Sequence, residues 1–146
     1  MQRPPDDEAL AESQGISDIR VATFNIGCSQ PVKKTTLLSQ VKKQMDELLH
    51  GNSIVCLQEA QGVYEILEQI ADARGWESIS TCHEGVTTFY NPAVFDLVED
   101  SVQRIWPEDS APNAEWRRLV CSTFRPRSDS DDHQLLGLFV VCNNHT

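Results

Sequence analysis

The stretch IVCLQE at residues 54–59 predicts a buried β-strand that ends in polar side chains. Its first four residues are apolar and show no helical spacing, which is typical of a strand buried on both faces. Two further stretches have the same form, IRVATFN at residues 19–25 and LFVVCNNH at residues 138–145. We therefore expect three buried strands, each closed by a residue capable of polar chemistry.

The closing side chains are an amide, a carboxylate and an imidazole, from Asn25, Glu59 and His145. Ligands of open α/β sheets collect beyond the carboxyl ends of the strands, so we expect these three groups to meet at one edge of a sheet. A carboxylate that closes a buried strand is costly unless it is paired or metal-bound, which makes Glu59 the strongest candidate. The alternatives are a salt bridge for Glu59 and a turn hydrogen bond for Asn25.

Composition and length indicate one globular domain. The chain has 146 residues, of which 40% are hydrophobic and 23% charged, as in ordinary globular proteins. No stretch reaches the roughly 20 apolar residues of a membrane span, and the N-terminus lacks the apolar core of a signal peptide. We expect a cytoplasmic or nuclear location. The five cysteines contain no C-x-x-C pair, so we expect buried free thiols and neither a zinc site nor a disulfide framework.

The formal net charge of −10 bears on the partners. An acidic surface repels nucleic acid, whose binding depends largely on neutralising phosphates. A bound divalent cation offsets this repulsion locally. The charge therefore favours a small phosphorylated substrate, or a nucleic acid held by contacts outside this chain.

The order of elements predicts the fold class. Residues 1–17 are rich in Pro, Asp and Glu and predict a disordered acidic leader. Apolar periodicity predicts helices at 32–50 and 62–74, the second capped by Gly75. Strand patterns occupy the remaining segments, at residues 19–25, 53–59, 76–81, 85–90, 95–105, 117–124 and 135–143.

We predict an α/β (α+β) fold in which two helices flank one face of a mixed sheet. The other face of that sheet needs a further layer, most naturally a second sheet. The chain is expected to be the first half of a larger sandwich.

Four motifs, in this order, resemble the endonuclease/exonuclease/phosphatase superfamily: VATFNI at residues 21–26, IVCLQEA at 54–60, GVTTFYNP at 85–92 and VVCNNH at 140–145. The resemblance implies a partial four-layer α/β sandwich, with residues 18–146 as the amino-terminal half of the domain. It also implies Mg²⁺-dependent hydrolysis of phosphate esters, whose substrates in the family include nucleic acids, inositol phosphates and sphingomyelin.

The resemblance also implies roles for individual residues. Asn25 matches the amide that orders the metal site, Glu59 the carboxylate that binds Mg²⁺ (or Mn²⁺), and His145 the histidine that contacts the scissile phosphate. An imidazole at a strand end can donate to a phosphate oxygen. Arg118 and Asn143 are candidate substrate contacts, because arginine suits bidentate binding of phosphate. For Arg118 the alternative is a charge that guards an edge strand.

The family pattern continues with Gly-Asp-x-Asn and Ser-Asp-His segments, which have no counterpart in their expected order within residues 1–146. We therefore expect a metal-dependent phosphoesterase by family, with little or no turnover by this chain alone. The alternative is a non-catalytic binding or scaffold module that self-associates through an uncovered sheet face. An unrelated α/β domain with accidental motif matches is the third possibility.

Overall fold

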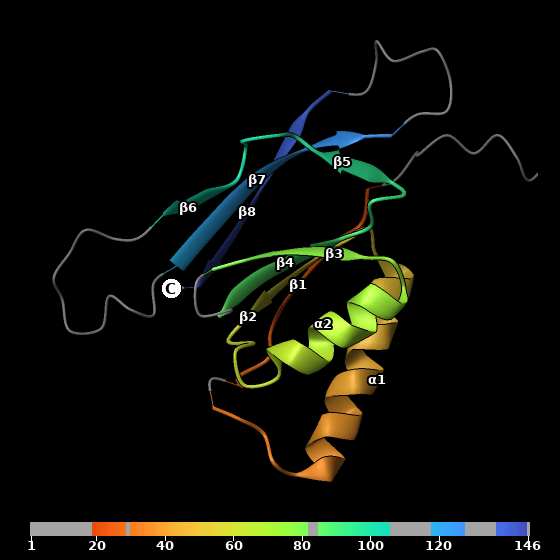
Figure 1. The fold of residues 1–146 in the computed structure, drawn as a ribbon, viewed down its shortest axis with the longest axis vertical. Helices are drawn as coiled ribbons and strands as arrows, with labels where there is room; N and C mark the ends of the chain where they lie inside the picture. Colours follow the sequence, from red (N-terminus) through yellow and green to blue (C-terminus); the bar gives the residue numbers. More distant parts are fainter. Residues whose placement is uncertain (1–18, 29, 82–84, 106–117, 128–136, 146) are drawn as a thin grey trace, which may run out of the picture.

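The computed structural model describes residues 19–28, 30–81, 85–105, 118–127 and 137–145, and the expected acidic leader lies outside these ranges. Two helices and two four-stranded sheets form a mixed α/β fold. Figure 1 shows both helices on one face of the first sheet and the second sheet on its opposite face. The predicted class, a mixed sheet flanked by two helices, is confirmed, and residues 95–145 supply strands for the expected second sheet.

The first sheet has the strand order β1-β2-β4-β3. Its strands are β1 (Val21–Asn25), β2 (Ile54–Gln58), β3 (Glu77–Ser80) and β4 (Val86–Tyr90). β1 and β2 are parallel, and the other two pairings are antiparallel. A parallel pair needs a crossover connection, which the first helix provides. The carboxyl ends of β1 and β2 therefore lie at the same edge.

The two helices are α1 (Thr35–Gly51) and α2 (Tyr64–Ala73). α1 buries Val41, Met45 and Leu49, spaced by four residues as one helical stripe requires. Leu37, in the first turn, is 39% exposed. Gly75 follows α2 with a φ of 70° and donates its N–H to the carbonyl of Asp72, which confirms the predicted cap.

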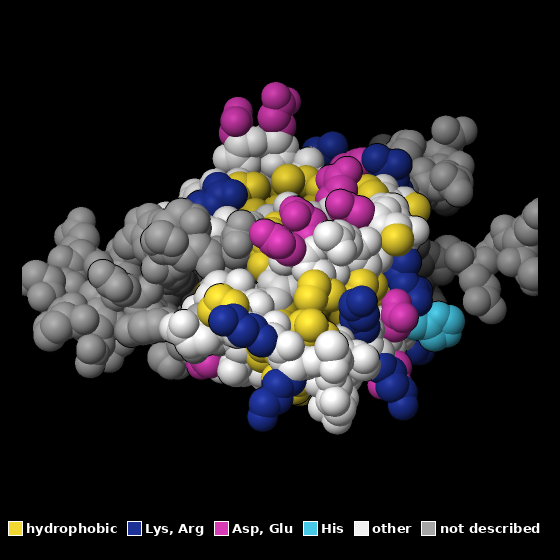
Figure 2. All heavy atoms as spheres, turned by 60° about the horizontal axis from the view of Figure 1, so that its bottom comes forward, with side chains coloured by type: hydrophobic (Ala, Val, Ile, Leu, Met, Phe, Trp, Pro, Cys, Tyr) yellow, Lys and Arg dark blue, Asp and Glu magenta, His cyan; other side chains and the backbone are white. Residues whose placement is uncertain are grey.

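The helical layer presents an ordinary charged surface. Lys42 and Lys43 of α1 are exposed. Figure 2 shows Lys and Arg side chains spread over this side of the molecule among acidic, hydrophobic and uncharged ones, not gathered in one patch. Neither helix of the described residues has the length and apolar character needed to cross a bilayer.

The second sheet is built around one long strand. β7 (Arg118–Pro126) pairs on one side with β8 (Phe139–His145) and on the other with β5 (Phe95–Leu97) and β6 (Gln103–Ile105). The strand pattern at 95–105, predicted as a strand or a strand pair, is thus two short strands. Asp100, with a φ of 58°, turns the backbone between them, in the left-handed region that Asp tolerates better than most residues.

An aromatic cluster fills the space between the sheets. Phe95 and Phe124 are fully buried there. The ring of Phe124 lies 5.0 Å from that of Tyr90 and 5.7 Å from that of Phe139. Such contacts add to the hydrophobic effect of burying large rings. This core fixes the second sheet against β4 and β2.

The three strands predicted to be buried on both faces differ in their burial. β2 is buried along its whole length, as predicted. β1 is mostly exposed, with Val21 at 51%, because it is an edge strand that pairs only with β2 among the described residues. In β8, Val140 is 62% exposed and Val141 9%. The prediction that all three runs are buried on both faces is therefore wrong for β1 and β8.

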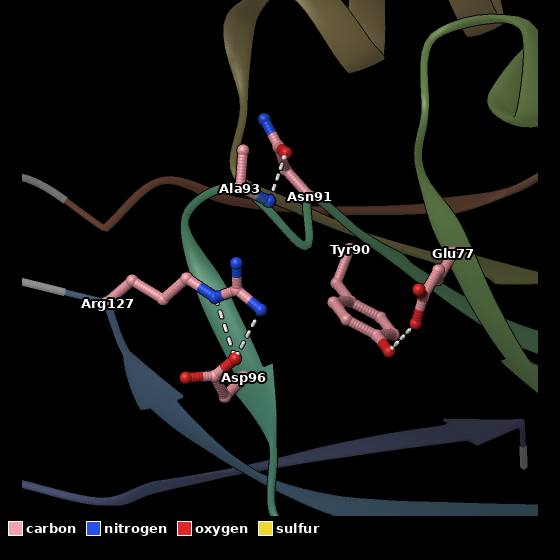
Figure 3. A network of polar contacts seen from close by, with 6 residues as sticks. All are labelled: Glu77, Tyr90, Asn91, Ala93, Asp96 and Arg127. Atoms are coloured by element: carbon pink, nitrogen blue, oxygen red, sulfur yellow. Dashed lines mark hydrogen bonds and ion pairs between the residues drawn. The ribbon is translucent and has the colours of Figure 1, made fainter.

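Two polar contacts lie at the end of the molecule that is opposite to the carboxyl ends of β1 and β2. Tyr90 donates its hydroxyl to Glu77, its register partner on β3 (Figure 3). Arg127, just after β7, forms an ion pair of 2.6 Å with Asp96 of β5. Burial and the neighbouring Glu77 carboxylate raise the pKa of Tyr90. The phenol is therefore held in its neutral, donating form.

Candidate active site

Asn25 and Glu59 lie side by side at the carboxyl ends of the parallel pair. Asn25 is the last residue of β1, and Glu59 follows the last residue of β2. The Asn25 amide nitrogen donates to Oε1 of Glu59 over 3.1 Å. The structure therefore joins an amide and a carboxylate that are 34 residues apart in the sequence.

The Asn25 side chain is held at both ends. Its Oδ1 accepts the backbone N–H of Gly27 over 2.8 Å, a local turn bond of the kind Asn often makes. Gly27 has a φ of 66°, which glycine adopts without steric cost. With its oxygen engaged by Gly27, Asn25 presents its NH₂ group to Glu59. The arrangement suits an amide that orients the carboxylate.

Glu59 sits in an unusual backbone conformation. Its φ is 51°, in the left-handed region that few residues other than glycine adopt. The flanking backbone is tied down, because the Glu59 carbonyl accepts the Cys28 N–H over 2.9 Å and the Ala60 N–H donates to Gly85 over 3.4 Å. Non-glycine residues in this region concentrate at functional sites, where the surrounding structure maintains the strain.

The carboxylate of Glu59 also influences a neighbouring thiol. Burial, and then the negative charge of Glu59, raise the pKa of Cys28. The Cys28 side chain is buried against the helical layer. The Cys28 thiol is therefore held in its neutral form.

A buried network of amides joins the two sheets next to this site. Gln58, the last residue of β2, donates its Nε2 to Asn143 Oδ1 over 2.7 Å and to Thr23 Oγ1 over 3.1 Å. The Asn143 amide nitrogen donates in turn to the carbonyls of Thr87 and Leu57, over 2.9 and 3.2 Å. Gln58 and Asn143 are 8% and 2% exposed.

Sequence reasoning missed Gln58. The available signal was a polar side chain inside an otherwise apolar strand, because buried polar groups almost always have hydrogen-bond partners. Asn143 was predicted as a substrate contact, which stays a prediction. In the structure its amide links β8 to β2 and β4.

The register of the second sheet places Arg118 and His145 opposite each other, at the start of β7 and the end of β8. For these two residues the structure describes the backbone and not the side chain. The Gln58–Asn143 bond brings the end of β8 to the end of β2. Figure 1 shows both strands running toward the same side of the molecule. The backbone of His145 therefore ends on the side of the fold that carries Glu59.

The donor set near Glu59 is sparse. Among the described residues, no three His, Cys, Asp or Glu side chains gather closely enough to hold a metal ion. Mg²⁺ does not require such a cage, since proteins often bind it through one or two carboxylates, with water and substrate phosphate completing the shell. One oriented carboxylate fits Mg²⁺ or Mn²⁺ held jointly with a phosphate group, and does not fit a structural zinc site.

No protein-family model matches the chain, and no curated protein sequence matches it. Solved structures share its fold, and two of them match as follows. The human Nocturnin catalytic domain with a bound sulfate anion matches with a TM-score of 0.59 and 17% identity, over 85% of this chain and 49% of that chain. ANGEL2, a 2′,3′-cyclic phosphatase in complex with adenosine-2′,3′-vanadate, matches with a TM-score of 0.59 and 15% identity, over 87% of this chain and 41% of that chain.

Both structures belong to the endonuclease/exonuclease/phosphatase superfamily. The chain shares the fold of these two structures, which confirms the resemblance at the level of fold. The chain spans about half the length of the structures that it matches.

Proposed function

We propose that this chain supplies the metal- and phosphate-binding part of a phosphoesterase site. One observation carries the proposal, the contact between Asn25 and Glu59 at the carboxyl ends of two parallel strands. The fold adds support, because one structural neighbour is a 2′,3′-cyclic phosphatase and the other binds a sulfate anion, which is similar in shape and charge to phosphate. The reaction proposed is hydrolysis of a phosphodiester or phosphomonoester.

Each candidate residue has a defined role in this proposal. Glu59 holds a Mg²⁺ or Mn²⁺ ion, and Asn25 orients its carboxylate. A metal bound there supplies Lewis-acid stabilisation of charge on the phosphoryl oxygens. His145 donates a hydrogen bond to a phosphate oxygen, and Arg118 contacts the same group as a cation. Asn143 contributes through the position of β8, and direct contact of its side chain with substrate stays a prediction.

The substrate class follows from charge. A chain of net charge −10 gains little from long-range attraction to polyanions. The proposed substrate is therefore a small phosphate ester or the end of a nucleic acid, held at the metal. Because the chain spans about half the length of its structural neighbours, we expect little or no turnover by the chain alone, and metal binding is the primary measurement.

The experiment measures Mn²⁺ binding by the loss of the free-ion electron paramagnetic resonance signal, with and without inorganic phosphate. Glu59→Gln should weaken Mn²⁺ binding at least tenfold, because it removes the carboxylate charge on which the proposed site depends. Glu99→Gln is the matched control, since Glu99 is exposed and lies in the segment that connects β5 to β6 of the second sheet. Equal Mn²⁺ affinity in the wild type and Glu59→Gln would remove the basis of the proposal.

Hydrolysis is measured separately with an aryl phosphodiester and Mg²⁺. The expected result is turnover near background. Robust turnover that Glu59→Ala abolishes would refute the expected inactivity and still support the site.

A binding or scaffold module is the second candidate, and exposed apolar side chains favour it. Leu138 and Val140 on the β8 side are 57% and 62% exposed. Exposed apolar surface of this kind marks interaction sites or aggregation liabilities. Sedimentation velocity discriminates, because a discrete dimer that Val140→Asp dissociates supports self-association. A monomer at all concentrations argues against it.

A further inference from the structure

Two cysteines lie side by side on adjacent strands of the second sheet. Cys121 of β7 and Cys142 of β8 are direct register partners in an antiparallel pair. Their sulfur atoms lie 2.6 Å apart, with Cys142 exposed and Cys121 half-buried. The prediction that the thiols are buried holds for Cys28 and Cys56 and is wrong for Cys142.

The backbone at this pair suits a covalent bond. Residues directly opposite in an antiparallel ladder have Cα atoms about 4.5 or 5.5 Å apart, according to the type of pair. Both separations fall within the range of about 4.4–6.8 Å found in disulfides. Cys56 provides the contrast, since its side chain is buried in the core and its sulfur lies 3.9 Å from the Thr88 hydroxyl. Of the described thiols, this pair alone combines a sulfur partner with access from solvent.

We propose that Cys121 and Cys142 are a redox modification site, which closes to a reversible cross-strand disulfide by exchange with a small disulfide of the oxidised-glutathione class. The proposal does not depend on the metal site. It concerns the outer face of the second sheet, where Val140 is also exposed.

The chemistry proceeds in two exchange steps that balance. The Cys142 thiolate attacks one sulfur of the small disulfide, forms a mixed disulfide and releases one small thiolate. The Cys121 thiolate then attacks Sγ of Cys142, forms the Sγ–Sγ bond and releases the second small thiolate. The two protons lost by the cysteines end on the two small thiols, so that two protein thiols are oxidised while one small disulfide is reduced.

Exposure decides the order of the two cysteines. Cys142 is accessible to a dissolved reagent, whereas Cys121 is half-buried. Burial and the adjacent Cys142 raise the pKa of Cys121 to about 11, which lowers its thiolate fraction at neutral pH. Cys121 therefore reacts second, when the mixed disulfide on Cys142 lies next to it. An exposed disulfide is also the labile kind that small thiols reduce again.

The bond would secure the strand that carries the candidate catalytic histidine. Cys142 directly precedes Asn143 and stands three residues before His145. A bond between residues 21 positions apart removes loop entropy from the unfolded chain, and we expect the melting temperature to rise by about 10 °C in a domain of this size.

The test equilibrates the full chain in glutathione buffers from fully reduced to fully oxidised, alkylates the remaining thiols and maps the peptides by mass spectrometry. The expected result is one crosslinked species that joins Cys121 to Cys142 and disappears with dithiothreitol, together with the rise in melting temperature. Absence of that species in oxidising buffer, or a glutathione adduct that persists on Cys142 of the unchanged chain, would overturn the proposal.

Variants separate the two roles. Cys121→Ser should trap the glutathione adduct on Cys142, and Cys142→Ser should acquire no adduct on Cys121. Cys28→Ser is the matched control and should form the same crosslink as the wild type. The crosslink is mapped in the wild-type chain, so the proposal is tested even if a variant is destabilised.

Discussion

Asn143 should contribute more to stability than any other polar side chain of β8, and Asn143→Ala tests this directly. The side chain is 2% exposed. Its three shortest hydrogen bonds are one of 2.7 Å accepted from Gln58 and two, of 2.9 and 3.2 Å, donated to backbone carbonyls of β4 and β2. A longer one of 3.4 Å runs to the Thr88 hydroxyl. These bonds connect the last strand to two strands of the other sheet.

The magnitude follows from these three bonds. A buried intramolecular hydrogen bond contributes about 1 kcal/mol net, and a buried group left without a partner costs about 1–3 kcal/mol. Gln58 keeps its bond to Thr23 after the substitution, so the penalty on its amide is partial. We expect Asn143→Ala to lower the free energy of unfolding by about 3–4 kcal/mol. In melting temperature this is a fall of about 10 °C for a domain of this size.

The assay is urea unfolding followed by tryptophan fluorescence and circular dichroism. Asn144→Ala is the matched control, because Asn144 is exposed on the same strand and its loss should change stability by less than about 0.5 kcal/mol. A double-mutant cycle with Gln58→Ala should give a coupling energy of about 1 kcal/mol or more. If Asn143→Ala and Asn144→Ala unfold at the same urea concentration, the hydrogen bonds of Asn143 do not stabilise the fold and the reasoning is wrong.

Three further predictions concern the core, the polar contact of Figure 3 and the candidate site. Phe124→Ala, at a fully buried ring, should cost about 3–5 kcal/mol in urea unfolding, whereas a similar loss from Val140→Ala on the exposed face would contradict the assigned burial. Because the pKa of Tyr90 is raised in the folded chain, the contribution of its neutral phenol is present below pH of about 10 and lost as the pH rises further. The stability difference between wild type and Tyr90→Phe should therefore shrink above that pH in alkaline melting curves, and a constant difference would contradict the shift. Asn25→Ala should weaken Mn²⁺ binding by about 10–100-fold if the amide orients the metal-binding carboxylate, and unchanged binding in the paramagnetic resonance titration would exclude that role.

The elements with local signals could be predicted from the sequence. α2 shows its apolar stripe and its capping Gly75 in consecutive residues, and both are found in the structure. β2 is apolar along its length and is buried on both faces because two strands and two further layers surround it. In these cases the pattern and its cause lie in the same segment.

Properties set by distant neighbours could not be predicted in this way. β1 is mostly apolar, as β2 is, yet it is an edge strand, and no property of residues 21–25 reveals how many strands flank them. The break in the segment 95–105 depends on β7, which pairs with both halves. Gln58 acquires its role from Asn143, 85 residues away.

The candidate site shows the same division. That Asn25 and Glu59 end neighbouring strands follows from two local patterns and from the parallel crossover that joins them. The orientation of the Asn25 amide depends on Gly27, and the left-handed turn at Glu59 depends on bonds to Cys28 and Gly85. Such tertiary contacts fix the angle at which a carboxylate is presented, and sequence patterns do not encode them.

β8 carries a hydrogen-bonding amide on one face and a reactive thiol on the other. Asn143 points inward and bonds to the first sheet, while Cys142 lies outward beside Cys121. A slip of one residue in register exchanges the faces of a strand, so it would bury the thiol and expose the amide, with the loss of all the bonds of Asn143. The inner network therefore specifies the register of β8, and the outer pair is aligned for exchange only in that register. Since His145 stands two residues beyond Asn143, the same register fixes where its backbone ends relative to Glu59.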